Sequence, residues 1–151
     1  MTRDGIELHA PADFDGMRRA GELAARILDE VADRVAPGVT TAALDDFIHD
    51  RMIAAGAEPA TLGYKGYPKS SCISINHVVC HGIPDEKALR DGDILNIDVT
   101  VILDGWYGDT SRMYVAGRPS RRAERLIQVT HDALMKGIEQ VRPGRTFGDI
   151  G

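Results

Sequence analysis

This chain of 151 residues is poor in long apolar runs, basic clusters and cysteine. No stretch approaches the roughly 18 apolar residues that a transmembrane helix needs, and the first residues lack the apolar core of a secretory signal. The formal charge of -5 and the lack of any run of five basic residues argue against a nucleic-acid-binding or anionic-membrane surface. We therefore expect a cytoplasmic protein that binds neither a membrane nor, directly, nucleic acid.

The two cysteines, Cys72 and Cys80, form neither a Cys-x-x-Cys zinc or redox motif nor a regular disulfide framework. In a cytosolic protein of this size they are expected to stay reduced. A nucleophilic set of Cys72, His81 and Asp98 is an alternative, because a catalytic cysteine needs a histidine nearby only in space. That set would leave Asp109 without a role, and no local pattern indicates an oxyanion hole.

Apolar residues make up 43% of the chain and charged residues 27%, as in an ordinary single globular domain. In three segments the apolar residues recur every three to four positions, which predicts amphipathic helices. These segments are 13–38 with Asp13 as the cap, 40–56 with Thr40 or Thr41 as the cap, and 120–144. Between the last two helices, residues 72–75 and 78–80 are short β-prone runs punctuated by glycine and proline.

Residues 94–103 and 106–115 predict two antiparallel strands, because both are rich in strand-forming residues and Asp104-Gly105 between them is a strong two-residue turn signal. Side chains alternate between the two faces of a strand. One face of the first strand is apolar and is expected to join the core: Leu95, Ile97, Val99, Val101 and Leu103.

The other face of this hairpin carries two carboxylates. The predicted register places Asp98 opposite Ser111 and Asp109 opposite Thr100, so the two aspartates become diagonal neighbours. Two carboxylates this close repel, and a positive group should sit between them. Gly108 leaves room for close approach of another segment or for a bulge that redirects Asp109. The alternative is two ordinary solvated hairpin aspartates.

An internal repeat is also suggested. Residues 35–40 match residues 141–146 at four of six positions, with a shift of 106. If the repeat is genuine, one unit of two helices followed by strands spans about residues 10–116 and a second begins at about residue 119. The alternative is chance, since a helix that ends at Pro-Gly before a threonine cap is common.

Four motifs, in this order and spacing, resemble the N-terminal half of bacterial type I methionine aminopeptidases: GYKGYPKSSCISIN at 63–76, VVCHGIP at 78–84, DGDILNIDV at 91–99 and GDTS at 108–111. The resemblance covers essentially the whole chain. It implies an α+β fold, half of a pseudo-two-fold pita-bread (creatinase/aminopeptidase) fold, in which helices pack on one side of a curved antiparallel sheet. It also implies that residues 1–151 are a single domain and the truncated N-terminal portion of a catalytic domain.

The activity implied by the resemblance is metal-dependent removal of the initiator methionine from nascent proteins. Asp98 resembles the family's carboxylate ligand of one metal, and Asp109 resembles the carboxylate that bridges two divalent ions. Carboxylate oxygen suits cobalt, manganese, iron or zinc, so the metal stays open. The implied partner is the N-terminal peptide of a nascent protein, and the ribosome is a further candidate.

Substrate contacts are implied in the same way. His81 resembles the family histidine near the scissile amide, where a positioned donor can stabilise developing charge. The adjacent Gly82 would let a substrate backbone approach. Tyr64, Tyr67 and Cys72 resemble part of the pocket for the methionine side chain, because aromatic faces and sulfur are favourable partners for a thioether.

Two further residues receive more modest assignments. Thr61 falls where some relatives place a cysteine, so a pocket role does not carry over to it from the resemblance. Trp106 at the hairpin tip is expected to be a rim or packing residue.

The family site needs ligands that this chain does not offer on strands. A further histidine, two glutamates and a second substrate-facing histidine would come from the missing C-terminal half. After Asp109 the only histidine and glutamates are His131, Glu124 and Glu139, all on a predicted helix. We therefore expect the 151-residue piece alone to bind metal weakly and to have negligible activity.

Two alternatives from other classes stay open. An Xaa-Pro aminopeptidase would share the two aspartates, although the GYPKS and HGIP runs argue against it. A metal-free binding module of the same fold is the other alternative, and the presence of His81, Asp98 and Asp109 argues against it.

Overall fold

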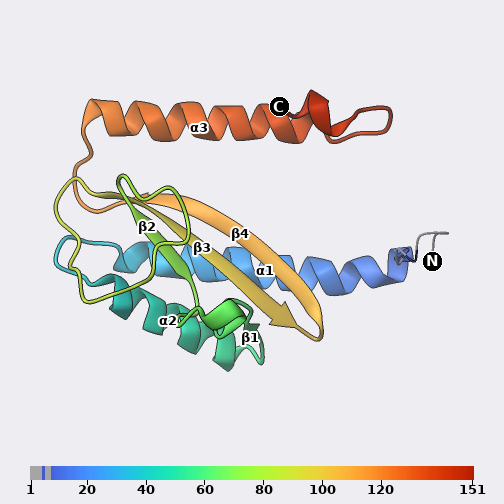
Figure 1. Cartoon of the computed structure of the whole chain (residues 1–151), viewed down its shortest axis with the longest axis horizontal. Helices are drawn as coiled ribbons and strands as arrows, with labels where there is room; N and C mark the ends of the chain where they lie inside the picture. The colour runs from blue at the N-terminus through green and yellow to red at the C-terminus, as the bar shows by residue number, and fades with distance from the viewer. Residues whose placement is uncertain (1–4, 6–7) are drawn as a thin grey trace.

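The computed structural model describes residue 5 and residues 8–151. The described chain forms three α-helices and four strands in the predicted order (Figure 1): α1 Phe14–Val31, α2 Thr41–Ala54, β1 Glu58–Pro59, β2 Cys72–Ile75, β3 Ile94–Leu103, β4 Trp106–Val115 and α3 Arg121–Glu139. Short 3-10 turns lie at Pro11–Asp13, Ala32–Arg34, Tyr64–Gly66 and Phe147–Asp149. Within these described residues, every helix is too short or too polar to cross a membrane.

Strand β3 is the centre of a four-stranded antiparallel sheet. β4 pairs with β3 along its whole length, while β2 and β1 share the other edge. Asp104 and Gly105 form the two-residue turn between β3 and β4, with φ of 51° and 82°, which suits a tight hairpin. Figure 1 shows β3 and β4 curving together. The predicted hairpin and its boundaries are confirmed.

One face of this sheet packs against α1 and α2. The β3 side chains on that face are fully buried, and they meet apolar residues of both helices: Leu95, Ile97, Val99 and Val101 from β3; Ala20, Leu23, Ala24, Ile27, Leu28 and Val31 from α1; Leu44, Ile48 and Met52 from α2. Burial of each large side chain stabilises the fold by about 1.5–3 kcal/mol. This core holds the strands that carry the acidic pair.

The N-termini of α1 and α2 form in different ways. Thr40 caps α2 as predicted, because its side-chain oxygen accepts the Ala43 N–H at 3.1 Å. The predicted cap at Asp13 is wrong. The chain already turns over Pro11–Asp13, so Asp13 has a helical backbone, and its carboxylate accepts the N–H of Ala10 at 2.7 Å instead.

The predicted end of the first helix and the β-prone run at residues 78–80 also differ from the structure. α1 ends at Val31 rather than at the Pro-Gly stop, because the chain tightens into the 3-10 turn Ala32–Arg34. Residues 78–80 form no strand. Val79 is 93% exposed and has no partner strand to pair with in the described structure, and β-branched residues favour strands mainly where a neighbouring strand and a core are available.

Helix α3 lies apart from the helices and sheet that form the core (Figure 1). Ser120 caps it by accepting the Ala123 N–H at 3.2 Å. None of its residues is buried, and its apolar side chains are exposed: Leu126, Val129, Leu134, Met135 and Ile138. The prediction of helices on one side of the sheet thus holds for α1 and α2, while the apolar face of α3 is uncovered by the described residues.

Candidate active site

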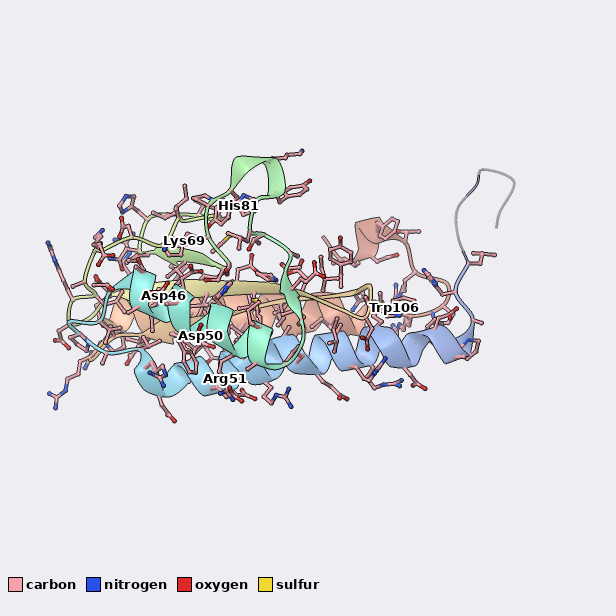
Figure 2. All side chains as sticks on the ribbon, turned by 90° about the horizontal axis from the view of Figure 1, so that it is seen from below. Asp46, Asp50, Arg51, Lys69, His81 and Trp106 are labelled. Atoms are coloured by element: carbon pink, nitrogen blue, oxygen red, sulfur yellow. The ribbon has the colours of Figure 1, made fainter. Side chains whose placement is uncertain are left out.

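A cavity of about 890 Å³ lies on the face of the sheet opposite α1. Figure 2 shows α1 on one side of the sheet and the loop that carries His81 on the other. The cavity is lined by the 60–68 loop, the loop that carries His81, and strands β2, β3 and β4. The lining residues are Ala60, Thr61, Tyr64, Lys65, Gly66, Tyr67, Pro68, Cys72, His81, Ile83, Asp98, Thr100, Tyr107 and Asp109. All six predicted site residues therefore lie at one cavity.

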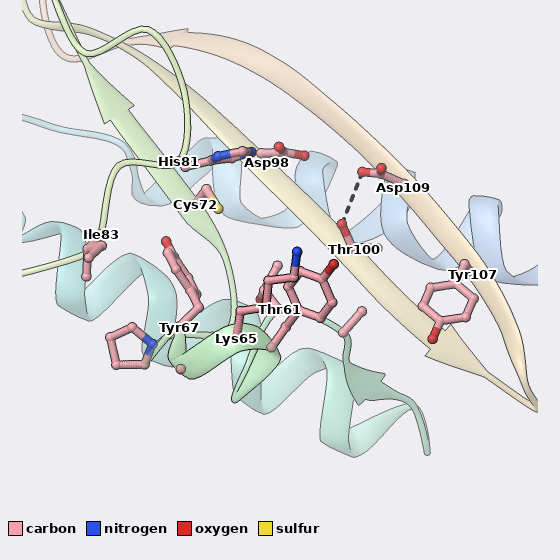
Figure 3. A pocket seen from close by; sticks show the side chains of 14 residues that line it. Thr61, Lys65, Tyr67, Cys72, His81, Ile83, Asp98, Thr100, Tyr107 and Asp109 are labelled. Atoms are coloured by element: carbon pink, nitrogen blue, oxygen red, sulfur yellow. Dashed lines mark hydrogen bonds between the residues drawn. The ribbon is translucent and has the colours of Figure 1, made fainter.

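The two aspartates occupy the predicted positions on adjacent strands. Asp98 pairs with Ser111, and Thr100 pairs with Asp109, so the two carboxylates are diagonal neighbours on the cavity face. Asp98 is half-buried and Asp109 is exposed. The Thr100 hydroxyl donates to Oδ1 of Asp109 at 3.1 Å (Figure 3). This hydrogen bond orients the Asp109 carboxylate.

The charges of this pair influence each other. Burial, and then the negative charge of Asp109, raise the pKa of Asp98 above its ordinary value, while His81 acts in the opposite direction. A carboxylate in such a place is stabilised in its charged form by a nearby cation. Carboxylate oxygens are good ligands for divalent manganese, iron, cobalt and zinc. The Asp98 and Asp109 side chains therefore fit part of a metal site.

The rest of a metal coordination shell is not assembled by the described residues. Within residue 5 and residues 8–151, no group of three or more histidine, cysteine, aspartate or glutamate side chains could hold a metal ion. Glu124, His131 and Glu139 lie on α3 and do not line the cavity, as the sequence predicted. Among the described residues, Asp98 and Asp109 are the two carboxylates that line the cavity.

Gly108 places Asp109 by letting β4 approach α1. A side chain at this position would overlap the backbone carbonyl of Ala20. The strand register runs without interruption from Ile102 to Ile94, so β4 has no bulge at Gly108. Of the two sequence-based explanations, close approach is confirmed and the bulge is wrong.

His81 has a left-handed backbone, with φ of 54°, and such conformations gather at functional sites. Its ring points toward Asp98 (Figure 3). The backbone of the adjacent Gly82 is bonded to β2. Its N–H donates to Ser74 Oγ at 3.1 Å, its carbonyl accepts the Ile73 N–H at 2.9 Å, and a side chain here would overlap the Ile73 carbonyl. Gly82 is needed because the His81 loop packs directly on β2.

Tyr67 and Cys72 form an ordered wall of the cavity. The Tyr67 hydroxyl lies 3.0 Å from the carbonyl oxygens of both Ser71 and Gly82 and can donate to either. Cys72 is buried and pairs with Asp98 across β2 and β3. Burial raises the pKa of both the Tyr67 hydroxyl and the Cys72 thiol. Both groups are therefore neutral at physiological pH.

Tyr64 and Thr61 lie at the cavity, whereas Trp106 does not. Tyr64 is exposed at the cavity, with Lys65 Nζ 5.4 Å from its ring centroid. Thr61 lines the cavity and donates to the Lys69 carbonyl at 3.1 Å. Trp106 lies outside the cavity and packs at the start of α1, as predicted.

Besides Thr61, seven lining residues were not predicted as site residues from the sequence: Ala60, Lys65, Gly66, Pro68, Ile83, Thr100 and Tyr107. Thr100 and Tyr107 share the strand face of Asp98 and Asp109, so the alternation of side chains could have identified them. Lys65 has φ of 49° within a 3-10 turn. Its inward position depends on that turn, for which the sequence carries no periodic signal.

Comparison with known proteins places this site in context. A model of metallopeptidase family M24 matches residues 15–151. The methionine aminopeptidase of Rickettsia prowazekii is 62% identical over 146 residues, which are 97% of this chain and 56% of that protein. The crystal structure of methionine aminopeptidase from Rickettsia prowazekii has a TM-score of 0.94 at 61% identity and is matched over 96% of this chain and 58% of that one. The chain thus spans little more than half the length of these relatives.

More distant structures share only the fold. The Xaa-Pro dipeptidase of Bacillus anthracis has a TM-score of 0.76 at 17% identity, over 87% of this chain and 36% of that one. The α+β pita-bread fold and the resemblance to methionine aminopeptidases are confirmed by these similarities. Since the family model covers the sheet, the acidic pair and the helices around them, this chain belongs to metallopeptidase family M24.

Proposed function

We propose that the full-length protein removes the N-terminal methionine from nascent proteins by hydrolysis that depends on two divalent metal ions. The observation that carries this proposal is one cavity in which two diagonal carboxylates face a wall of aromatic and sulfur-containing side chains and His81. The similarity to proteins named methionine aminopeptidase supports it.

Asp98 and Asp109 are the proposed metal ligands, with Asp109 as the bridge between the two ions. When bound, such a pair of ions would polarise the scissile carbonyl and provide hydroxide at neutral pH. Cobalt, manganese, iron and zinc all accept this kind of ligand. The hydrogen bond from Thr100 holds the Asp109 carboxylate in one orientation, which is the usual contribution of a residue behind a metal ligand.

The substrate roles follow from the cavity wall. Tyr67 and Cys72 would contact the methionine side chain, each contact with the thioether contributing about 0.3–1.5 kcal/mol. Tyr64 would cover the pocket from its exposed position. His81 points toward Asp98, and there it would donate a hydrogen bond to the substrate beside the scissile amide.

We further propose that residues 1–151 are one domain and the N-terminal portion of a longer catalytic domain, with a first repeat at about residues 10–116 and a second from about residue 119. The chain spans 56% of its Rickettsia relative, and α3 has an exposed apolar face that further chain could cover. A C-terminal half would supply the remaining metal ligands. The proposed setting is the cytoplasm, where nascent chains leave the ribosome.

The test uses the full-length protein, first treated with a chelator and then titrated with manganese, cobalt, iron or zinc. We expect a Met-Ala-Ser peptide to be cleaved only after metal is restored, with two ions bound per protein. Asp109→Asn should lower activity by more than about 100-fold, because it removes a ligand rather than a residue behind one. Asp104→Asn is the matched control, since this exposed carboxylate lies at the hairpin turn and pairs with Arg19 at 3.2 Å.

The other outcomes separate the alternatives. Preferential cleavage of an Xaa-Pro peptide would replace the methionine aminopeptidase proposal with the Xaa-Pro class. Absence of both metal binding and cleavage would favour a binding module. Turnover by the 151-residue chain alone, at a rate comparable to that of the full-length protein, would contradict the proposal that essential ligands lie outside it.

A further inference from the structure

Asp45 of α2 is a buried carboxylate with an unusual set of contacts. It is 3% exposed. Its Oδ1 accepts the N–H of Ser70 at 3.1 Å, the N–H of Ser71 at 2.8 Å and the Ser71 hydroxyl at 2.7 Å. Its Oδ2 lies 3.8 Å from Lys69 Nζ. Among the described residues, the polar side-chain contacts of this carboxylate all go to one short segment, residues 69–71.

This segment continues directly into the cavity wall. Ser71 precedes Cys72, and its carbonyl oxygen lies 3.0 Å from the Tyr67 hydroxyl. Tyr67 and Cys72 are therefore each separated from the Asp45-bound segment by a single hydrogen bond or peptide bond. The loop that carries His81 has its own attachment, because Gly82 bonds to the backbone and side chain of β2.

His49 of α2 makes a further polar contact to this segment, with its Nδ1 2.8 Å from Ser70 Oγ, while the contacts of α2 with the core are apolar. On its buried face Leu44, Ile48 and Met52 join the apolar core, and apolar contacts tolerate small shifts because they have no preferred direction. Hydrogen bonds depend on direction, and a buried N–H that loses its acceptor must move to find another. Asp45 accepts three of the four hydrogen bonds between α2 and residues 69–71, so it has the largest part in placing this segment relative to the sheet.

We propose that Asp45 is a positioning residue for the methionine side-chain pocket: it fixes residues 69–71 and through them places Tyr67 and Cys72 beside Asp98. Asp45 does not line the cavity, so it acts through these neighbours. The inference rests on the proposed function, because it assigns Tyr67 and Cys72 to the methionine side chain.

The test compares steady-state kinetics of full-length variants on a Met-Ala-Ser peptide. Asp45→Ala removes the acceptor, and we expect KM to rise at least about tenfold while kcat changes less than about twofold, the pattern of lost binding that is equal in ground and transition states. Asp45→Asn keeps an oxygen at Oδ1 for all three hydrogen bonds and should restore KM to nearly the wild-type value.

A second readout does not depend on turnover. Calorimetric titration with L-methionine should show weaker binding to Asp45→Ala by a factor similar to the change in KM. If Asp45→Ala does not fold, Ser71→Ala replaces it, because this variant removes one hydrogen bond and keeps the backbone contacts. We expect Ser71→Ala to raise KM about fivefold, as loss of one such bond predicts.

Two control variants separate positioning from general stability. Asp46→Ala removes the next carboxylate of α2, which is exposed, and should change nothing. Ile48→Ala weakens the core on the same helix without touching the cavity. It should reduce the folded fraction, and therefore the apparent kcat, at constant KM.

The results distinguish the two proposals. If the wild-type protein cleaves the peptide and Asp45→Ala lowers kcat at constant KM, as Ile48→Ala does, the positioning role is wrong. If the wild-type protein neither cleaves the peptide nor binds L-methionine, the proposed function itself fails. A rise in KM in Asp45→Ala that Asp45→Asn reverses would establish the positioning role.

Discussion

The side chains on the two faces of β3 share one backbone but differ in polarity, burial and surroundings. On one face Leu95, Ile97, Val99 and Val101 are 0% exposed and pack against α1 and α2. On the other face Asp98 and Thr100 line the cavity. A strand can serve both purposes because successive side chains point to opposite sides. Substitutions on the core face should therefore lower the free energy of unfolding. Substitutions on the cavity face should lower metal affinity or activity.

The largest effect is expected on the core face. Ile97→Ala should lower the free energy of unfolding of the full-length protein by about 2–5 kcal/mol, because the side chain is fully buried and leaves a cavity. Urea denaturation measures this change. Ile102→Ala is the matched control: Ile102 lies on the other face and is partly exposed, so an equal loss there would contradict the distinction between the faces.

On the cavity face, Thr100→Val should separate activity from stability. Loss of the hydrogen bond to Asp109 should lower metal affinity or activity by about 10–100-fold. The free energy of unfolding should change by less than about 0.5 kcal/mol, because Thr100 is partly exposed. Thr110→Val, opposite Val99 on the core side, is the control. Unchanged metal binding in Thr100→Val would show that Thr100 does not orient Asp109.

Gly108→Ala should affect both faces at once. The added methyl group would overlap the Ala20 carbonyl of α1, and relief of such crowding costs about 1–3 kcal/mol. Because β4 must shift, Asp109 should shift as well, and activity should fall together with stability. Gly21→Ala places the same methyl group in open space on α1 and should instead stabilise the protein by about 0.5–1 kcal/mol. Thermal unfolding and peptide turnover measure the two effects.

The smallest effect is expected on α3. Leu134 is 59% exposed, so Leu134→Ser should change the free energy of unfolding of the 151-residue chain by less than about 0.5 kcal/mol. Leu28, at the corresponding place in the suggested repeat, is 1% exposed, and Leu28→Ala should cost about 2–5 kcal/mol. A much larger loss for Leu134→Ser in the full-length protein would indicate that further chain covers this helix face.

The hairpin was predictable because each of its signals is local. Strand-forming residues, the Asp104-Gly105 turn and the alternation of side chains all act within about twenty residues of one another, and together they allow one register. Asp98 and Asp109 followed from that register. The helix boundaries were less accurate, since the 3-10 turn Pro11–Asp13 and the turn after Val31 are small adjustments that propensity does not resolve.

The contacts that the sequence did not predict are those between distant segments. Gly82 packs on Ile73, and Asp45 accepts hydrogen bonds from a segment 25 or 26 residues further along the chain. Such contacts depend on how α2 and β2 pack around the core. No periodic pattern encodes them, because each is made by one or two residues.

The amino-acid sequence by itself determined the secondary structure of the hairpin and placed its two carboxylates on one face, since both follow from turn chemistry and the two-residue period of a strand. Only the tertiary structure decided what surrounds that face: the 60–68 loop, the left-handed His81 and the Asp45-bound segment. The physical reason is that these groups meet through hydrogen bonds and close backbone packing between segments far apart in the chain. Those contacts exist only once the core of α1, α2 and β3 has formed.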